Sequence, residues 1–210
     1  TVKNQADHER TIRVFMHQVF QISRGGRGDT ALYVPDAHYI LDYKGRCSLL
    51  IYGQTADGTS FDQFSIGNYG IEGKEGTYKD AEDGELTNNA VEHGGVDTVI
   101  RCSVELAPGT ETKLEYWIVA ADSQYNAEKI HKRILTDTLK ARLEKTRHGW
   151  YEWLDIARDE LQTMTEKERQ LVKKSLMVIK AHTDKRGGII ASCDSSIYNF
   201  GRDYYSYVWP

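Results

Sequence analysis

Residues 9–121 contain several runs of hydrophobic residues at strand-like spacing, and this pattern predicts β structure. Residues 12–22 place hydrophobic side chains at both odd and even positions, which predicts a strand that is covered on both faces. Two shorter runs, 38–43 and 47–54, are separated by a turn that contains Gly45, a residue able to adopt positive φ. The first part of the chain is therefore predicted to be a set of antiparallel strands.

The most regular alternation lies in residues 96–106 and 114–120. Pro108-Gly109 separates these two runs, and because this pair favours a turn, we predict a hairpin. Residues 67–95, which precede it, are rich in glycine and acidic residues and are predicted to form loops with at most one short strand. Several short strands joined by turns indicate a β-sandwich.

Beyond Asp122 the spacing of hydrophobic residues changes from that of a strand to that of an α-helix. Leucine and isoleucine recur at helical spacing between Ile130 and Leu143, which predicts an amphipathic helix that Gly149 ends. A second hydrophobic stripe follows, formed by Trp150, Trp153, Leu154 and Ala157. We expect this stripe to pack the linker helix against the sandwich.

Thr165 and Glu168 have the spacing of a capping box, in which the threonine oxygen accepts a free N–H and the glutamate bonds back to the backbone. A further hydrophobic stripe at helical spacing follows, and Gly187-Gly188 ends the helical region. This signature predicts a helix that begins directly after Thr165.

The predicted fold class is α+β, an antiparallel β-sandwich followed by helices. We assign the sandwich domain to residues 1–122, a helical linker to 123–163 and an α-helical domain to 164–210. The composition, 40% hydrophobic and 28% charged residues, is that of an ordinary globular protein.

The net charge of −4 gives no electrostatic reason to expect nucleic acid or an anionic membrane as a partner. Without a run of about 18 apolar residues, the sequence predicts no membrane span. The three cysteines are far apart and are predicted to be reduced thiols, which favours a cytoplasmic location. His17, His38 and His182 lack the spacing of metal ligands, so no metal site is expected.

The end of the chain combines aromatic rings with hydrogen-bonding groups, which suits the apolar faces and the hydroxyls of a sugar. It reads Gly187-Gly188-Ile189-Ile190-Ala191-Ser192 and, later, Tyr205-Ser206-Tyr207-Val208-Trp209-Pro210. This segment resembles the first active-site loop of the glucoamylase-like glycoside hydrolases, family 15. In that family an Arg-Asp pair follows the tryptophan, and this sequence ends before it. Segments 13–17, 28–31 and 38–39 also resemble the sandwich of archaeal and bacterial members.

The resemblance implies that this chain is a fragment of a larger enzyme. The fragment begins inside the sandwich and ends after the first helix of an (α/α) barrel of helical hairpins. Family members hydrolyse terminal α-glucosidic bonds with inversion and release β-glucose. Inversion uses two carboxylates about 6.5–9.5 Å apart, one as acid and one as base that activates water. Both are glutamates of later barrel loops in the family, so no catalytic residue is assigned in this chain.

By position in the motif, Tyr205, Tyr207 and Trp209 match the family's substrate-binding region, and the resemblance implies that they contact an α-glucan or oligosaccharide. The pattern alone favours aromatic packing between helices instead. Asp194 and Asp203 are the carboxylates of the same segment, but turn-stabilising hydrogen bonds suit them better than catalysis.

The leading hypothesis is therefore that the chain is part of an inverting, exo-acting α-glucosidase of glucoamylase type. Trehalase and glucodextranase activity are alternatives within the family. A second hypothesis is a carbohydrate-binding or scaffold module without catalysis. A third is a β-sandwich interaction protein with no affinity for sugars.

Overall fold

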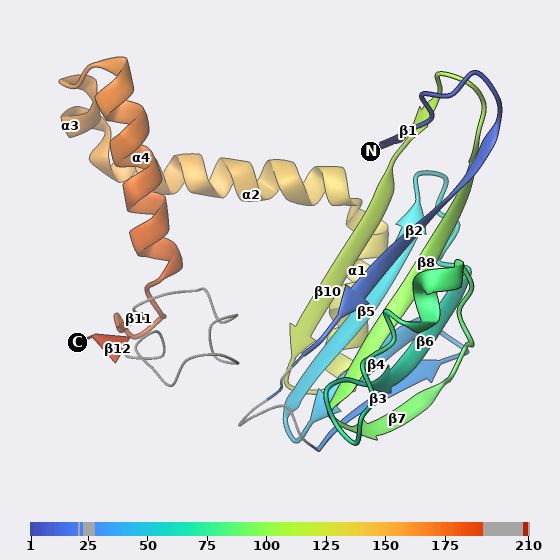
Figure 1. Cartoon of the computed structure of the whole chain (residues 1–210). Coiled ribbons are helices and arrows are strands. Elements are labelled where there is room, and N and C mark those ends of the chain that lie inside the picture. Colours follow the sequence, from blue (N-terminus) through green and yellow to red (C-terminus); the bar gives the residue numbers. More distant parts are fainter. Residues whose placement is uncertain (21, 23–27, 191–207, 210) are drawn as a thin grey trace. The chain divides into compact units, whose positions relative to one another are not determined.

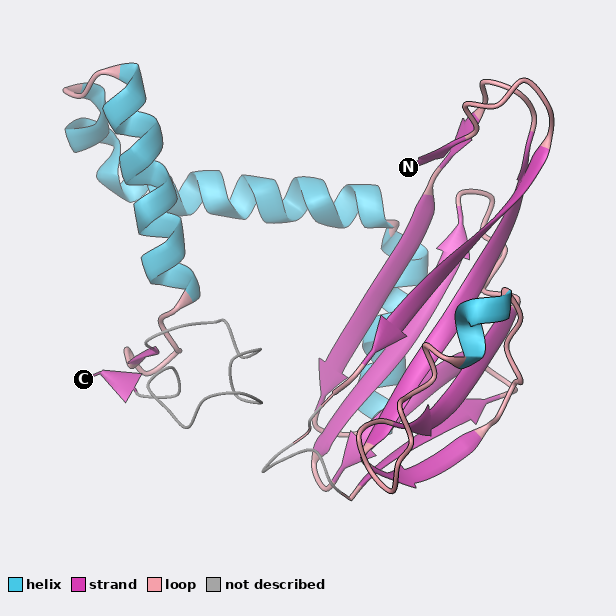
Figure 2. Ribbon diagram, in the orientation of Figure 1, coloured by secondary structure: helices cyan, strands magenta, loops and turns pink. Residues whose placement is uncertain are grey.

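The computed structural model describes residues 1–20, 22, 28–190 and 208–209. The chain divides into two compact units, Thr1–Leu139 and Lys140–Pro210. The first unit holds the large sheets, one α-helix and a short 3-10 helix, and the second holds the remaining described helices (Figures 1 and 2). The boundary between the units falls inside the predicted linker.

Two antiparallel sheets form most of the first unit. The larger has the strand order β10-β5-β4-β3-β7, with the bounds β3 Asp29–Val34, β4 Tyr39–Lys44, β5 Cys47–Thr55, β7 Val91–Gly94 and β10 Leu114–Ala121. The smaller has the order β2-β8-β6, with the bounds β2 Arg10–Gln18, β6 Gln63–Asn68 and β8 Val96–Leu106. A short pair joins β1 (Val2–Lys3) to β9 (Glu111–Thr112).

The two sheets face each other across a hydrophobic core. Strand β8 is deeply buried, because every residue from Val96 to Cys102 is buried. Gly53 of β5 lies opposite, and a Cβ atom built on it would lie 3.0 Å from Cδ1 of Ile100. The absence of a side chain at Gly53 therefore permits the close approach of the sheets.

Helix α1 (Gln124–Asp137) packs on the other face of the larger sheet, against β5 and β10 (Figure 1). The indole N–H of Trp117 donates to Nδ1 of His131 at 3.1 Å, and the hydroxyl of Tyr39 donates to the carboxylate of Glu128 at 2.5 Å. Alternate residues of the larger sheet thus face two different layers, which explains why its central strands are buried on both faces.

The predicted hairpin between residues 96–106 and 114–120 is wrong, although both strands exist. Strand β8 pairs with β2 and β6, whereas β10 pairs with β5 in the other sheet. The connection binds the N-terminal segment instead: Gly109 donates its N–H to the carbonyl of Asn4, and Asn4 donates its N–H to the carbonyl of Thr110. Alternation shows which face a residue occupies but not which strand lies beside it.

Two predicted boundaries also differ from the structure. The strand predicted over residues 12–22 ends at Gln18, and it is an edge strand whose hydrophobic residues are only half-buried. The first helix ends at Thr138, where φ is 60°, and not at Gly149, which lies within α2 (Leu139–Leu154). Glycine lowers the stability of an exposed helix by about 1 kcal/mol without breaking it, whereas a positive φ interrupts the helix.

Residues 67–95 form loops with one 3-10 turn, η1 (Asp80–Asp83), and the short strand β7, in agreement with the prediction. Thr77 of this segment donates to Asp97 of β8, and the carbonyl of Gly84 accepts from Arg101 of β8. The segment therefore covers the outer face of the smaller sheet, with η1 in front of it in Figure 2.

In the second unit α2 is followed by η2 (Asp155–Ala157), α3 (Arg158–Gln162), α4 (Glu166–Ala181) and a short pair of strands, β11 (Ile189–Ile190) and β12 (Val208–Trp209). The predicted capping box is confirmed. Thr165 Oγ1 accepts the N–H of Glu168 at 3.4 Å, and the Glu168 carboxylate accepts the N–H of Thr165 at 2.9 Å.

The prediction of an α+β chain, with antiparallel sheets followed by helices, is confirmed. Across the part of the chain that the structure describes, no helix combines the length and the hydropathy needed to cross a membrane.

Candidate functional site

The aromatic segment predicted to bind sugar lies largely outside the described residues. Tyr205 and Tyr207 fall outside them, as do Asp194 and Asp203. Trp209 is described through its backbone alone, as part of β12. The predicted contact of these residues with a substrate therefore stays a prediction.

Backbone pairing nevertheless connects the two described ends of this segment, Ile189–Ile190 and Val208–Trp209. Trp209 pairs with Ile189 across the β11–β12 ladder, so the structure brings the two ends of the predicted sugar-binding motif together. Thr183 forms an isolated bridge with Ile189, and the N–H of Ile190 donates to the carbonyl of His182 at 2.9 Å. The base of the motif is thus attached to the C-terminal end of α4.

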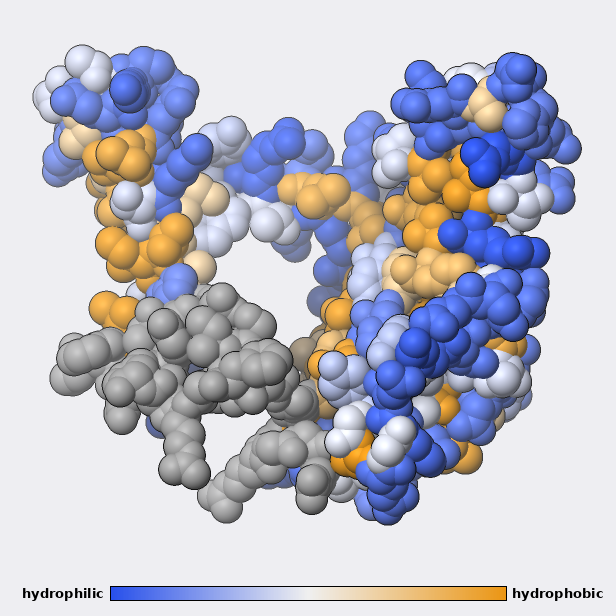
Figure 3. All heavy atoms as spheres, in the orientation of Figure 1, coloured by the Kyte–Doolittle hydropathy of each residue, from blue (hydrophilic) through white to orange (hydrophobic). Residues whose placement is uncertain are grey.

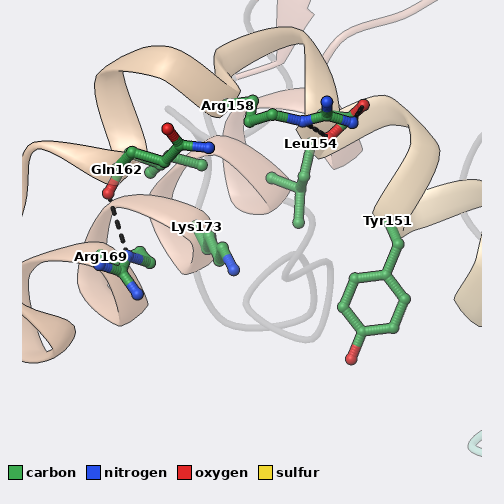
Figure 4. A pocket seen from close by; sticks show the side chains of 8 residues that line it. Tyr151, Leu154, Arg158, Gln162, Arg169 and Lys173 are labelled. Atoms are coloured by element: carbon green, nitrogen blue, oxygen red, sulfur yellow. Dashed lines mark hydrogen bonds and ion pairs between the residues drawn. The ribbon is translucent and has the colours of Figure 1, made fainter.

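A pocket of about 330 Å³ lies among the helices of the second unit (Figure 4). Residues of α2, η2, α3 and α4 line it: Tyr151, Leu154, Asp155, Arg158, Leu161, Gln162, Arg169 and Lys173. Its volume is at the lower end of the range for small-molecule sites, roughly 300–1,000 Å³.

Most of the charge in this pocket is already paired. Arg158 forms a bidentate ion pair with Asp155, which raises the pKa of the Arg158 guanidinium. Arg169 donates to the carbonyl oxygens of Leu161 and Met164. The lining holds a single carboxylate, that of Asp155, which is paired with Arg158. The pocket therefore offers no pair of carboxyl groups for the acid–base hydrolysis of a glycosidic bond.

A second cluster lies on the outer face of the smaller sheet, and we name it the His17 cluster: His17, Tyr69, Thr77, Tyr78 and Asp97. Nε2 of His17 lies 2.7 Å from Oδ2 of Asp97, whose side chain has no exposed surface. The same oxygen accepts the backbone N–H of Thr77 at 2.6 Å and its hydroxyl at 2.8 Å.

Sequence reasoning missed the His17 cluster, because it considered His17 only as a possible metal ligand and rejected that role. His17 and Asp97 are 80 residues apart and lie on neighbouring strands. Alternation did not show that these two strands are neighbours, and it gave no sign that Thr77 would reach Asp97 from a glycine-rich loop.

Two other histidines of the first unit, His38 and His131, pack against aromatic rings. His38 bonds to the hydroxyl of Tyr33 at 2.6 Å and stacks on Phe61 at a centroid distance of 4.4 Å. His131 of α1 accepts a hydrogen bond from the indole N–H of Trp117, and burial lowers the pKa of its imidazole.

One buried carboxylate is not used by either site. Asp42 of β4 has no exposed surface, and neither of its carboxylate oxygens has a hydrogen-bond partner among the described residues. Burial and the nearby charge of Asp29 raise the pKa of Asp42 to about 7. Asp29 itself lies 3.2 Å from the ammonium of Lys44.

The fold resembles part of a glycoside hydrolase. The similar solved structure is a crystal structure of a bacterial glucoamylase complexed with acarbose, with a TM-score of 0.58 and 14% sequence identity. The match covers 86% of this chain and 25% of that chain, so this chain spans about a quarter of the glucoamylase. At this identity the similarity establishes the fold alone. No family model and no curated protein matches the sequence.

Proposed function

We propose that this chain is part of an inverting, exo-acting α-glucosidase of glucoamylase type, which releases β-glucose from the ends of α-glucans or oligosaccharides. The observation that carries the proposal is the similarity in fold to the bacterial glucoamylase over 86% of the chain. The motif from Gly187 to Trp209, which resembles a sugar-binding loop of that enzyme family, supports it independently.

In this proposal the chain contributes binding and not acid–base chemistry. Tyr205, Tyr207 and Trp209 form one wall of a glucose pocket, where aromatic faces pack on the apolar faces of the sugar. The pairing of Trp209 with Ile189 supports this role, because it fixes the end of the motif to α4. Water is the nucleophile, the two catalytic glutamates belong to other parts of the enzyme, and no organic cofactor takes part.

The hydrophobic surface of α4 supports a larger helical domain. Leu171, Val178 and Ile179 are each more than half exposed, and hydrophobic side chains gather along this helix in Figure 3. An amphipathic helix with an exposed apolar stripe is suited to packing against further helices. We place the enzyme in the cytoplasm, with no nucleic acid or membrane partner.

The test is an assay of the protein that contains this chain on maltose, maltotriose, dextran and trehalose, with the anomer of the first product followed by NMR. We expect β-glucose from an α-glucan, and a fall in kcat/KM of at least about tenfold for Trp209→Ala, with partial recovery in Trp209→Phe. Tyr125→Ala is the control, because Tyr125 is an exposed tyrosine of α1.

The same assay separates the alternatives. Hydrolysis of trehalose or dextran in preference to maltose indicates trehalase or glucodextranase activity. Sugar binding without hydrolysis indicates a carbohydrate-binding or scaffold module. The absence of both binding and hydrolysis would overturn the proposal.

A further inference from the structure

We propose that the His17 cluster is a second binding site for α-glucan, on the sandwich and separate from the aromatic motif at the end of the chain. The choice of glucan as the ligand rests on the proposed function, whereas the existence of the site rests on the geometry of the cluster. The site takes a neutral, polyhydroxylated chain.

Two tyrosines of the cluster are partly exposed, and the ammonium of Lys79 lies 5.6 Å from the centroid of the Tyr78 ring. Tyr69 is 42% exposed and Tyr78 is 39% exposed. Their ring centroids lie 6.5 Å and 6.0 Å from that of His17, so the imidazole is a neighbour of both rings. Partly exposed aromatic rings beside a polar heterocycle match a sugar, which has apolar C–H faces and polar edges.

The rings are held in place by the backbone between them. Gly76 has a φ of 124°, and a Cβ atom built there would lie 2.8 Å from the ring of Tyr69 and 3.3 Å from the ring of Tyr78. Glycine is therefore required where the chain passes between the two rings. The N–H of Tyr69 donates to the carbonyl of Gly95 at 2.8 Å, which ties this part of the loop to the start of β8.

The hydrogen bond to Asp97 fixes the orientation of the His17 imidazole. Because the Asp97 carboxylate accepts the proton of Nε2, the neutral ring of His17 carries its acceptor lone pair on Nδ1. Nδ1 makes no hydrogen bond with any described residue, and the His17 side chain is 29% exposed. A sugar hydroxyl can therefore donate to Nδ1 while its ring packs on a neighbouring tyrosine.

Asp97 makes this arrangement rigid without offering a charge to the ligand. Its Oδ2 atom accepts three hydrogen bonds, one from His17 and two from Thr77, and its side chain is fully buried. A Cβ atom on Gly76 would also lie 2.8 Å from Oδ2 of Asp97, so the loop closes directly over the carboxylate. Such support of a surface residue by a buried, hydrogen-bonded group is what a preorganised binding site requires.

The cluster is not suited to hydrolysis. The Asp97 carboxylate is buried, its Oδ2 atom accepts three hydrogen bonds, and the hydroxyl of Thr77 donates to Asp97 and not to His17. The described geometry thus provides neither an activated nucleophile nor a pair of carboxylates at the spacing of a glycosidase. Binding is the activity that the geometry supports.

The experiment uses the protein that contains this chain, with soluble starch in affinity electrophoresis and maltoheptaose in calorimetric titration. We compare the wild type with Tyr69→Ala/Tyr78→Ala, and use Tyr125→Ala as the matched control, because Tyr125 is an exposed tyrosine of the same unit. The double variant should bind maltoheptaose roughly tenfold or more weakly and migrate faster through starch, while its rate on maltose stays unchanged.

A second measurement does not depend on the folding of a variant. In the wild type, saturation with maltoheptaose should shift the NMR signals of the His17 imidazole. As a separate check, the variant Tyr69→Phe/Tyr78→Phe keeps both rings and should retain most of the binding. The inference is overturned if the His17 signals do not move or if the alanine variant is retained by starch as strongly as the wild type.

The outcomes also separate this inference from the proposed function. If the protein hydrolyses maltose and its retention by starch does not depend on Tyr69 and Tyr78, the second binding site is overturned and the proposed function is kept. If retention by starch depends on these tyrosines but the protein hydrolyses no α-glucoside, the second binding site is kept and the proposed function is overturned.

Discussion

At the scale of the residue, Asp42 couples the stability of the sandwich to pH. Its pKa is about 7 in the folded chain, compared with 3.8 for an unperturbed carboxyl group. Between these values the folded chain binds a proton that the unfolded chain releases, so the free energy of unfolding should fall as pH rises from about 4 to about 7. The slope from this group reaches at most about 1.4 kcal/mol per pH unit and disappears above pH 7. Chemical denaturation at a series of pH values measures it.

The variant Asp42→Asn isolates this effect, because it keeps the shape of the side chain and removes the charge. We expect it to be more stable than the wild type at pH 8 and to lose the fall in stability between pH 4 and 7. The control is Asp57→Asn: Asp57 lies in an exposed turn, where hydrogen bonds from Thr55 and Thr59 lower its pKa. Asp57 therefore stabilises the fold above the unperturbed pKa and ceases to do so as pH falls, a dependence of opposite sign. Parallel pH profiles for Asp42→Asn and the wild type would contradict the assignment.

At the scale of the element, the capping box of α4 is a local signal that the sequence contained in full. Thr165 Oγ1 accepts the N–H of Glu168, and the Glu168 carboxylate accepts the N–H of Thr165. Thr165→Ala should destabilise α4 by about 1 kcal/mol, because it leaves a helix N–H without an acceptor. Hydrogen exchange of the amides in the first turn of α4 measures this loss. Thr163→Ala should have a smaller effect, since Thr163 donates to the carbonyl of Glu160 and caps no N–H of α4. Equal effects of the two substitutions would show that the cap contributes nothing.

The elements also show what the sequence predicts and what it leaves open. The alternation in residues 96–106 predicted a strand correctly, because it depends on neighbours two positions apart. The partner of that strand was predicted wrongly, since β8 pairs with β2, whose residues lie far away in the sequence. The His17 cluster was missed for the same reason, because it joins β2, β8 and a loop. The helix break at Thr138 had no recognisable signal, as threonine seldom adopts positive φ.

At the scale of the whole molecule, the two substitutions in Asp42 and Thr165 should act independently. Asp42 lies in the unit Thr1–Leu139 and Thr165 in the unit Lys140–Pro210, and the contacts that each substitution alters are internal to its own unit. Changes that share no partners usually have additive effects on the free energy of unfolding. Asp42→Asn at pH 8 should therefore slow hydrogen exchange in the strands of the first unit and leave α4 unchanged, whereas Thr165→Ala should accelerate exchange in α4 and leave β8 unchanged. The double variant should show both changes with their single-variant magnitudes. If instead either substitution changes exchange in both units to the same extent, the units unfold as one cooperative body, and the division at Leu139 does not describe how the protein loses its structure.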